Sequence, residues 1–249
     1  NIPYDFIFKT NYFTKNIYFI SDRFLKKKIK ARTKVINWRV GSVLDKSMNE
    51  GLYGEKFVPL RNEIFKYRKE KFQNGIPKVV LSMGSGDILN LISHVLEIYK
   101  RKYLKKFDLQ VIMQSHHKNF DNIIEQYGND ARFLVDIQPV EIFEVISASQ
   151  FAIASGGHSI YEYSYIGTPV IHVLTAKNQH PATSWNDTGF TYPLGWYQKE
   201  SFKKRLTKGI EYFLNQNNVI KSSRKGKRII DGSGASRLVN TIKEECKIN

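Results

Sequence analysis

The residues best suited to chemistry in this chain lie between Phe151 and Gln179, where two apolar runs each lead into a polar turn. The first run ends in Ser155-Gly156-Gly157, and glycines let a backbone approach a ligand closely. The sequence predicts a helix directly after this turn, beginning near His158 and Ser159. Its free N–H groups and positive dipole end would point at the turn, which favours an anion such as phosphate.

A carboxylate and two amides extend this pattern. Glu162 lies about one turn into the predicted helix, where it can accept hydrogen bonds from two sugar hydroxyls. A Gly-Thr-Pro break at 167–169 ends the helix, and a second apolar strand leads to Asn178 and Gln179. Amides suit sugar recognition because each has donors and an acceptor, although helix capping by Asn178 explains that residue equally well. Together these residues predict half of a nucleotide-sugar site.

A second glycine turn, Gly84-Ser85-Gly86, follows an earlier apolar strand and precedes Asp87. Its simplest explanation is a tight strand-to-helix turn with Asp87 as the helix N-cap. The turn matches neither the full dinucleotide fingerprint nor a P-loop with its lysine. It is a candidate for nucleotide binding because parallel strands would place it on the same rim as the Ser155 turn.

Apolar strands alternate with helices after Pro77, which indicates βαβ units and a parallel sheet. Strands are predicted over 78–83, 109–113, 131–135, 151–154 and 170–174, and helices over 88–101, 120–127, 140–147, 159–166, 180–187 and 199–214. The preceding residues lack this alternation, and a turn signal at 73–77 separates them from the regular region. We therefore expect two domains, 1–76 and 77–249.

The net charge of +16 favours acidic partners such as a nucleoside diphosphate or an anionic membrane face. Basic clusters at 26–28, 203–205 and 221–228 are interpreted as solvated helix faces and a basic loop. The sequence has no interleaved basic and aromatic stripe, so we do not expect nucleic acid as a partner. No apolar run is long enough to span a bilayer. The single cysteine, Cys246, fits a reducing compartment, and we expect a cytoplasmic protein whose basic surface suits the inner membrane face.

A set of motifs resembles the carboxyl half of a GT-B family that includes the UDP-2,4-diacetamido-2,4,6-trideoxy-β-L-altropyranose hydrolases of pseudaminic acid synthesis. Related spore-coat polysaccharide proteins share the pattern, and the peptidoglycan UDP-N-acetylglucosamine transferase is a more distant relative. The resemblance covers roughly residues 52–240. Its motifs are, in order, Leu52 to Arg61, Gly84 to Asp87, Ser155 to Glu162 with Gly167 and Pro169, Asn178-Gln179, and Asp231 to Arg237.

The resemblance implies two Rossmann-like halves facing a cleft, with this chain supplying the parallel α/β sheet of the carboxyl half after a remnant of the amino half. The Ser155 turn would bind the diphosphate of a UDP-sugar, Glu162 the ribose, and Asn178 with Gln179 the sugar or phosphate. It implies UDP-amino-sugar hydrolysis in bacterial surface-glycan or nonulosonic acid synthesis, without a metal or other cofactor.

The sequence departs from this family in its amino half. The Gly-x-Gly-His motif that supplies the family's catalytic histidine is absent from this sequence, so no catalytic residue is assigned. The chain begins at Asn1 within a strand-like segment, and we expect a fragment or a processed product that acts with an amino-terminal half. Two alternatives stay open: a GT-B glycosyltransferase, or a non-catalytic module that binds nucleotide-sugars.

Overall fold

The structure is a computed structural model that describes residues 17–21, 33–45, 50–70, 75–84 and 87–246. It divides into two compact units. The large unit comprises Arg61–Ile229, and the small unit comprises the described residues up to Leu60 together with those from Ile230 on. The two units are described separately below.

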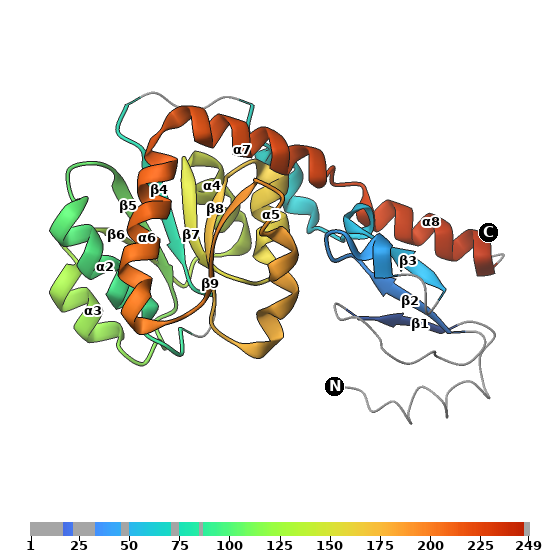
Figure 1. Cartoon of the computed structure of the whole chain (residues 1–249), viewed down its shortest axis with the longest axis horizontal. Coiled ribbons are helices and arrows are strands. Elements are labelled where there is room, and N and C mark those ends of the chain that lie inside the picture. The colour runs from blue at the N-terminus through green and yellow to red at the C-terminus, as the bar shows by residue number, and fades with distance from the viewer. Residues whose placement is uncertain (1–16, 22–32, 46–49, 71–74, 85–86, 247–249) are drawn as a thin grey trace. The chain divides into compact units, whose positions relative to one another are not determined.

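The large unit is built on a six-stranded parallel sheet in the order β6-β5-β4-β7-β8-β9 (Figure 1). The strands are β4 (Lys78–Ser82), β5 (Asp108–Met113), β6 (Arg132–Val135), β7 (Phe151–Ser155), β8 (Val170–Leu174) and β9 (Thr191–Trp196). Five of them agree with the predicted strands to within one residue at each end. The edge strand β9 was not predicted.

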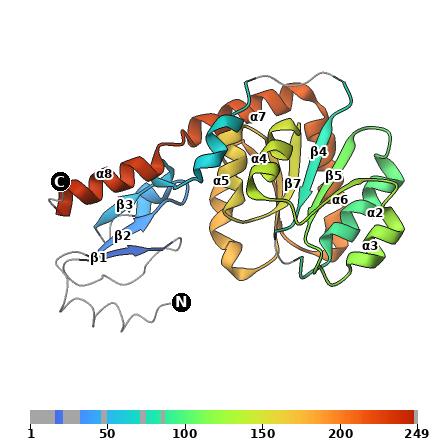
Figure 2. The same cartoon turned by 180° about the vertical axis from the view of Figure 1, so that it is seen from behind.

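Helices cover both faces of this sheet, as Figures 1 and 2 show from opposite sides. They are α2 (Leu91–Lys102), α3 (Phe120–Tyr127), α4 (Pro139–Ala148), α5 (Ser159–Ile166), α6 (Lys199–Leu214) and α7 (Gln216–Ile229), with 3-10 helices η3 (Asn62–Tyr67) and η4 (Lys177–Trp185). On one face, buried apolar side chains of β4, β5, β7 and β8 pack against α2, α3 and α6. The predicted Rossmann-like α/β class is confirmed.

The segment 221–228, interpreted from sequence as a basic loop, instead lies within α7. Its buried face carries Val219, Ser222, Ser223 and Gly226 rather than a stripe of large apolar residues. Ser164 of α5 donates a hydrogen bond to the Gly226 carbonyl at 2.9 Å. This helix therefore packs closely through small residues rather than through large apolar side chains.

The division at Leu60 differs from the predicted boundary at residue 76. The reason is that η3 packs on the large unit: the ring of Phe65 lies 5.6 Å from that of Tyr165, and the ring of Tyr67 lies 6.2 Å from that of Phe143. The last helix, α8 (Gly234–Cys246), belongs to the small unit rather than to the sheet domain.

The small unit contains a three-stranded parallel sheet of β1 (Ile17–Ile20), β2 (Thr33–Asn37) and β3 (Gly51–Tyr53), with 3-10 helices η1 (Ser42–Asp45) and η2 (Glu55–Phe57). From α8, Leu238 and Ile242 pack against Ile36, Leu52 and Phe57. An apolar cluster therefore joins the last helix to strands far away in the sequence.

Two sequence motifs meet within this unit. Arg237 donates one hydrogen bond to Asp231 at 2.9 Å and another to the Lys56 carbonyl at 3.0 Å. A Cβ atom on Gly234 would lie 2.0 Å from the backbone oxygen of Val58. The motif 231–237 is thus explained by packing against the connection 52–61.

Replacing Gly234 by alanine is expected to destabilise the small unit, because the added methyl group would collide with backbone that cannot rotate away. Overpacking of this kind costs about 1–3 kcal/mol. Urea denaturation and hydrogen exchange of α8 amides measure the effect. The exposed Ser236→Ala variant in the same helix is the control, and equal stability of the two variants would contradict the close contact at Val58.

Candidate functional site

The order of strands places the two glycine turns together. The chain runs outward from β4 in one direction through β5 and β6, and in the other through β7, β8 and β9. Open parallel sheets bind ligands outside the carboxyl ends of the strands at such a reversal. A Cβ atom on Gly84 would lie 3.6 Å from the Ser155 hydroxyl oxygen, so the turns after β4 and β7 adjoin. Ser85 and Gly86 lie outside the described residues.

The helices that follow these turns differ at their N-termini. The Asp87 carboxylate accepts hydrogen bonds from the backbone N–H groups of Leu91 at 2.7 Å and Ile92 at 2.8 Å. It satisfies two N–H groups at the start of α2, although the N-cap position belongs to Asn90 rather than to Asp87 as the sequence predicts. The Oδ2 atom of Asp87 lies 3.6 Å from Nε2 of His117. In contrast, among the described residues no side chain accepts a hydrogen bond from the first N–H groups of α5. Since the first N–H groups of a helix lack partners within the helix, α5 is the better seat for an anion.

The turn before α5 is closely packed at one glycine and open at the next. Ser155 and Gly156 are buried, and the Gly156 N–H donates to the Val173 carbonyl at 2.8 Å. A Cβ atom on Gly156 would lie 2.5 Å from the Leu174 side chain, whereas one on Gly157 would meet nothing within 4 Å. Gly157 and His158 are exposed and Ser159 is half-buried. The packing therefore fixes the turn at Gly156 and leaves the backbone at Gly157 accessible.

Glu162 is buried on α5, with only 7% of its surface exposed. One carboxylate oxygen lies 3.4 Å from Nε of Arg61, whose side chain is 56% exposed. Among the described residues, the second oxygen has no hydrogen-bond partner. Burial raises the pKa of Glu162, and the nearby charges of Arg61 and His158 oppose this increase. Arg61 is not among the site residues predicted from sequence, where it belongs to the connection motif.

Asn178 and Gln179 lie in η4, the element after β8. The side-chain oxygen of Gln179 accepts hydrogen bonds from the backbone N–H of Thr175 at 2.7 Å and from its hydroxyl at 3.1 Å. That oxygen therefore holds the turn in place. Asn178 is exposed, and the N-cap position of η4 belongs to Ala176, so Asn178 does not serve as the cap.

In the part of the chain that the structure describes, no cluster of three or more His, Cys, Asp or Glu side chains is placed to hold a metal ion. No helix there combines the length and apolar character needed to cross a membrane.

No family model matches the chain. An uncharacterized protein of Methanocaldococcus jannaschii is 24% identical over 151 residues, which cover 55% of this chain and 31% of that protein. The match thus spans about a third of the curated relative.

Solved structures extend the likeness at the level of fold. The MurG protein of Acinetobacter baumannii superposes with a TM-score of 0.70 at 12% identity, covering 96% of this chain and 69% of that one. The spinosyn rhamnosyltransferase SpnG in complex with thymidine diphosphate gives 0.55 at 16% identity, covering 69% and 46%. The UDP-GlcNAc 2-epimerase of Neisseria meningitidis bound to UDP-GlcNAc gives 0.50 at 15% identity, covering 72% and 46%. The chain therefore has the Rossmann-like fold of the carboxyl half of GT-B proteins.

Proposed function

We propose that this chain supplies the nucleotide-sugar-binding half of a GT-B glycosyltransferase. The diphosphate would lie on the backbone N–H groups at Gly157, His158 and Ser159, and the ribose hydroxyls would donate to Glu162. The proposal rests on the adjacency of three features: the open turn at the strand reversal, the start of α5, which no side chain of the described residues caps, and the buried carboxylate of Glu162. Gly84 and the amides of Asn178 and Gln179 would border the same ligand.

We prefer glycosyl transfer to UDP-sugar hydrolysis because a glycosyltransferase is among the solved proteins that share this fold. The spinosyn protein is a rhamnosyltransferase and the Neisseria protein is an epimerase, and both structures hold a nucleotide or nucleotide-sugar. None of the three solved structures described above is named as a UDP-amino-sugar hydrolase, the activity that the sequence resemblance implies. We propose that an amino-terminal GT-B half completes the cleft and binds the acceptor.

Calorimetric titration with UDP tests this proposal, with CDP and GDP as controls for the base. We expect UDP to bind in the micromolar range and the controls to bind more weakly. If none of the three nucleotides bound, the proposal would be contradicted. Binding by UDP without sugar transfer in the full-length protein would favour the non-catalytic module over the enzyme.

Replacing Gly157 by valine is expected to weaken UDP binding by about tenfold or more, which corresponds to ~1.4 kcal/mol. The new side chain would project into the space above the start of α5 where we place the diphosphate. Because a Cβ atom at this position meets nothing within 4 Å, the melting temperature should stay unchanged.

Gly156→Ala provides the contrast for this variant, since its added methyl group would collide with Leu174 and lower the stability instead. Calorimetry and thermal unfolding of both variants separate the two effects. Full UDP affinity in Gly157→Val would exclude the turn as the diphosphate site.

A further inference from the structure

Arg61 is placed beside the candidate ribose carboxylate by the element that follows it. It occupies the N-cap position of η3, where its backbone is extended. The ring of Phe65 in η3 packs edge-on against Tyr165 of α5 at 5.6 Å. The ring of Tyr67 lies 6.2 Å from that of Phe143 on α4. The backbone from which the Arg61 side chain extends is therefore fixed against two helices of the large unit.

The guanidinium group of Arg61 contacts a side chain of each of these helices. Its Cζ atom lies 5.9 Å from the centre of the Phe143 ring on α4. Its Nε atom lies 3.4 Å from a carboxylate oxygen of Glu162 on α5. Arginine suits this position because its planar group stacks on aromatic rings and also pairs with carboxylates. These contacts hold a side chain of which 56% is exposed.

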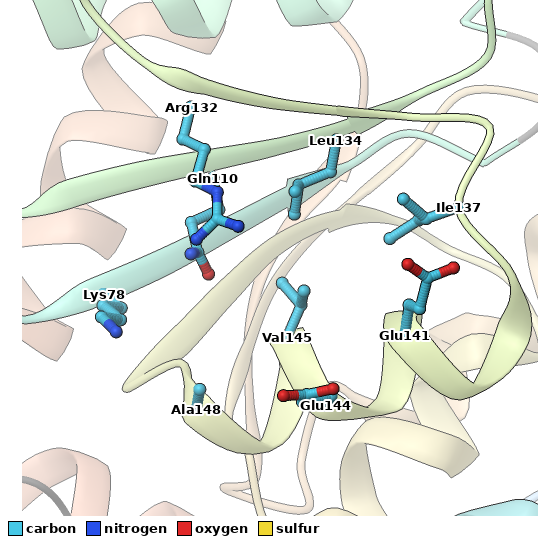
Figure 3. Close-up of a pocket in the computed structure, with 9 residues that line it drawn as sticks. All are labelled: Lys78, Gln110, Arg132, Leu134, Ile137, Glu141, Glu144, Val145 and Ala148. Carbon is cyan, nitrogen blue, oxygen red and sulfur yellow. The ribbon is translucent and has the colours of Figure 1, made fainter.

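Other side chains of α4 border a separate cavity of about 220 Å³ between this helix and the sheet (Figure 3). Its lining includes Glu144 and Arg132, but none of Arg61, Phe143 and Glu162. The pair of Arg61 and Glu162 is therefore distinct from this cavity. Arg132 provides an exposed arginine near α4 with which Arg61 can be compared.

Burial and nearby charges act on the Glu162 carboxylate in opposite directions. Burial raises the pKa of Glu162, whereas the charges of Arg61 and His158 lower it. Burial also raises the pKa of the adjacent Tyr163 hydroxyl, which therefore stays neutral. A histidine can lose its charge between pH 5 and pH 8, but an arginine keeps its charge. Arg61 is thus a permanent positive charge that favours the ionised form of Glu162.

The ionised form matters because a carboxylate then acts only as an acceptor and can receive hydrogen bonds from two hydroxyl groups. We propose that Arg61 is a positioning residue, whose guanidinium group holds the Glu162 carboxylate in the orientation that accepts hydrogen bonds from the ribose of a nucleotide. This inference rests on the proposed function, in which Glu162 binds the ribose. Because Arg61 is half exposed, its charge is partly screened by water, and its effect on Glu162 should be moderate.

Calorimetric titration with UDP between pH 4.5 and pH 8 tests this role in the native protein, Arg61→Met and Arg61→Lys. Affinity should fall on acidification, and the midpoint of this fall should lie at higher pH in Arg61→Met. At the acidic end, Arg61→Met should bind UDP about threefold to tenfold more weakly than the native protein. Arg61→Lys should restore most of the loss. Unchanged affinity in Arg61→Met, or a loss of equal size at every pH, would overturn the proposal.

Two controls separate the effect of Arg61 from other charges. Arg132→Met removes the same charge from an exposed position at the cavity beside α4, and it should keep the native pH profile. The comparison of native Arg61 with Arg61→Met is repeated in a His158→Gln background, because a histidine can change its charge in this pH range. The shift in midpoint should persist there, and its disappearance would overturn the assignment to Arg61.

A measurement without nucleotide distinguishes this inference from the proposed function. Carbon NMR follows the titration of the Glu162 carboxyl group, whose signal is assigned with Glu162→Gln. The midpoint should lie at higher pH in Arg61→Met than in the native protein, and an unchanged midpoint would overturn the inference even if UDP binds. A shifted midpoint without any UDP binding would contradict the proposed function and leave the coupling of Arg61 to Glu162 in place.

Discussion

The stability of the native protein is expected to rise between about pH 6.5 and about pH 9 because Lys69 is buried, and replacing Lys69 by methionine should remove most of this rise. Lys69 follows η3 and is 9% exposed. Its ammonium group donates to the Ser149 carbonyl and, at 3.0 Å, to the Thr168 hydroxyl. These two partners are neutral, and burial together with the charge of Lys227 lowers the pKa of Lys69 from 10.5 to about 7.

The direction of the effect follows from proton binding. Between the native pKa of about 7 and the unfolded value of 10.5, the unfolded chain holds a proton that the native state has released. Stability therefore rises with pH across this window, and the cost of the buried charge is fully present below it. From pH 6.5 to pH 9 the expected gain is about 2–3 kcal/mol.

Urea denaturation at several pH values measures this gain in the native sequence and in Lys69→Met. The difference in free energy of unfolding between Lys69→Met and the native protein should favour the variant most at the acidic end of the range. This difference should shrink toward pH 9. Lys66→Met, an exposed change in η3, is the control and should keep the native profile. Parallel profiles for the native protein and Lys69→Met would show that Lys69 stays charged in the fold.

Replacing Glu162 by alanine is expected to weaken UDP binding by about 1–3 kcal/mol, the range for hydrogen bonds to a charged group. The loss should be seen mainly in affinity, because Arg61, the partner left behind, is largely exposed and can be hydrated. This expectation depends on the proposed ribose contact.

Calorimetric titration of Glu162→Ala with UDP gives the measurement, and Glu125→Ala, an exposed change on α3, serves as the control. Since burial raises the pKa of Glu162 above 4.5, affinity should also fall as the pH is lowered through that raised value. Native affinity in Glu162→Ala would remove this residue from the site.

Local sequence determined most of the sheet and the identity of its turns. Buried parallel strands consist of continuous apolar runs, and Val170–Leu174 or Phe151–Ser155 can be located from that property alone. Edge strand β9 was not predicted from the sequence because Pro193 and Gly195 interrupt its apolar pattern, and an edge strand tolerates such residues. Helix α7 was not predicted from the sequence because its buried face consists largely of small residues such as Ser223 and Gly226.

Only the tertiary structure decided which of the predicted groups are available to a ligand. The sequence predicts that Asp87 caps the helix after the Gly84 turn, and the structure shows its carboxylate bonded to the N–H groups of Leu91 and Ile92. Among the described residues, no side chain is hydrogen-bonded to the first N–H groups of α5. Gln179 likewise uses its oxygen on Thr175, and Glu162 gains Arg61 as a partner. These differences arise from hydrogen bonds and packing between segments, which residue type and spacing do not specify.

The same reason explains the small unit. The motif 231–237 and the connection 52–61 can each be recognised in the sequence as separate features. Their contact through Gly234 and Val58 arises because the last residues of the chain fold into the same unit as the first ones. Period and composition determine the elements of this protein. The partners of each polar group depend on long-range packing, which fixes where a ligand can still bind.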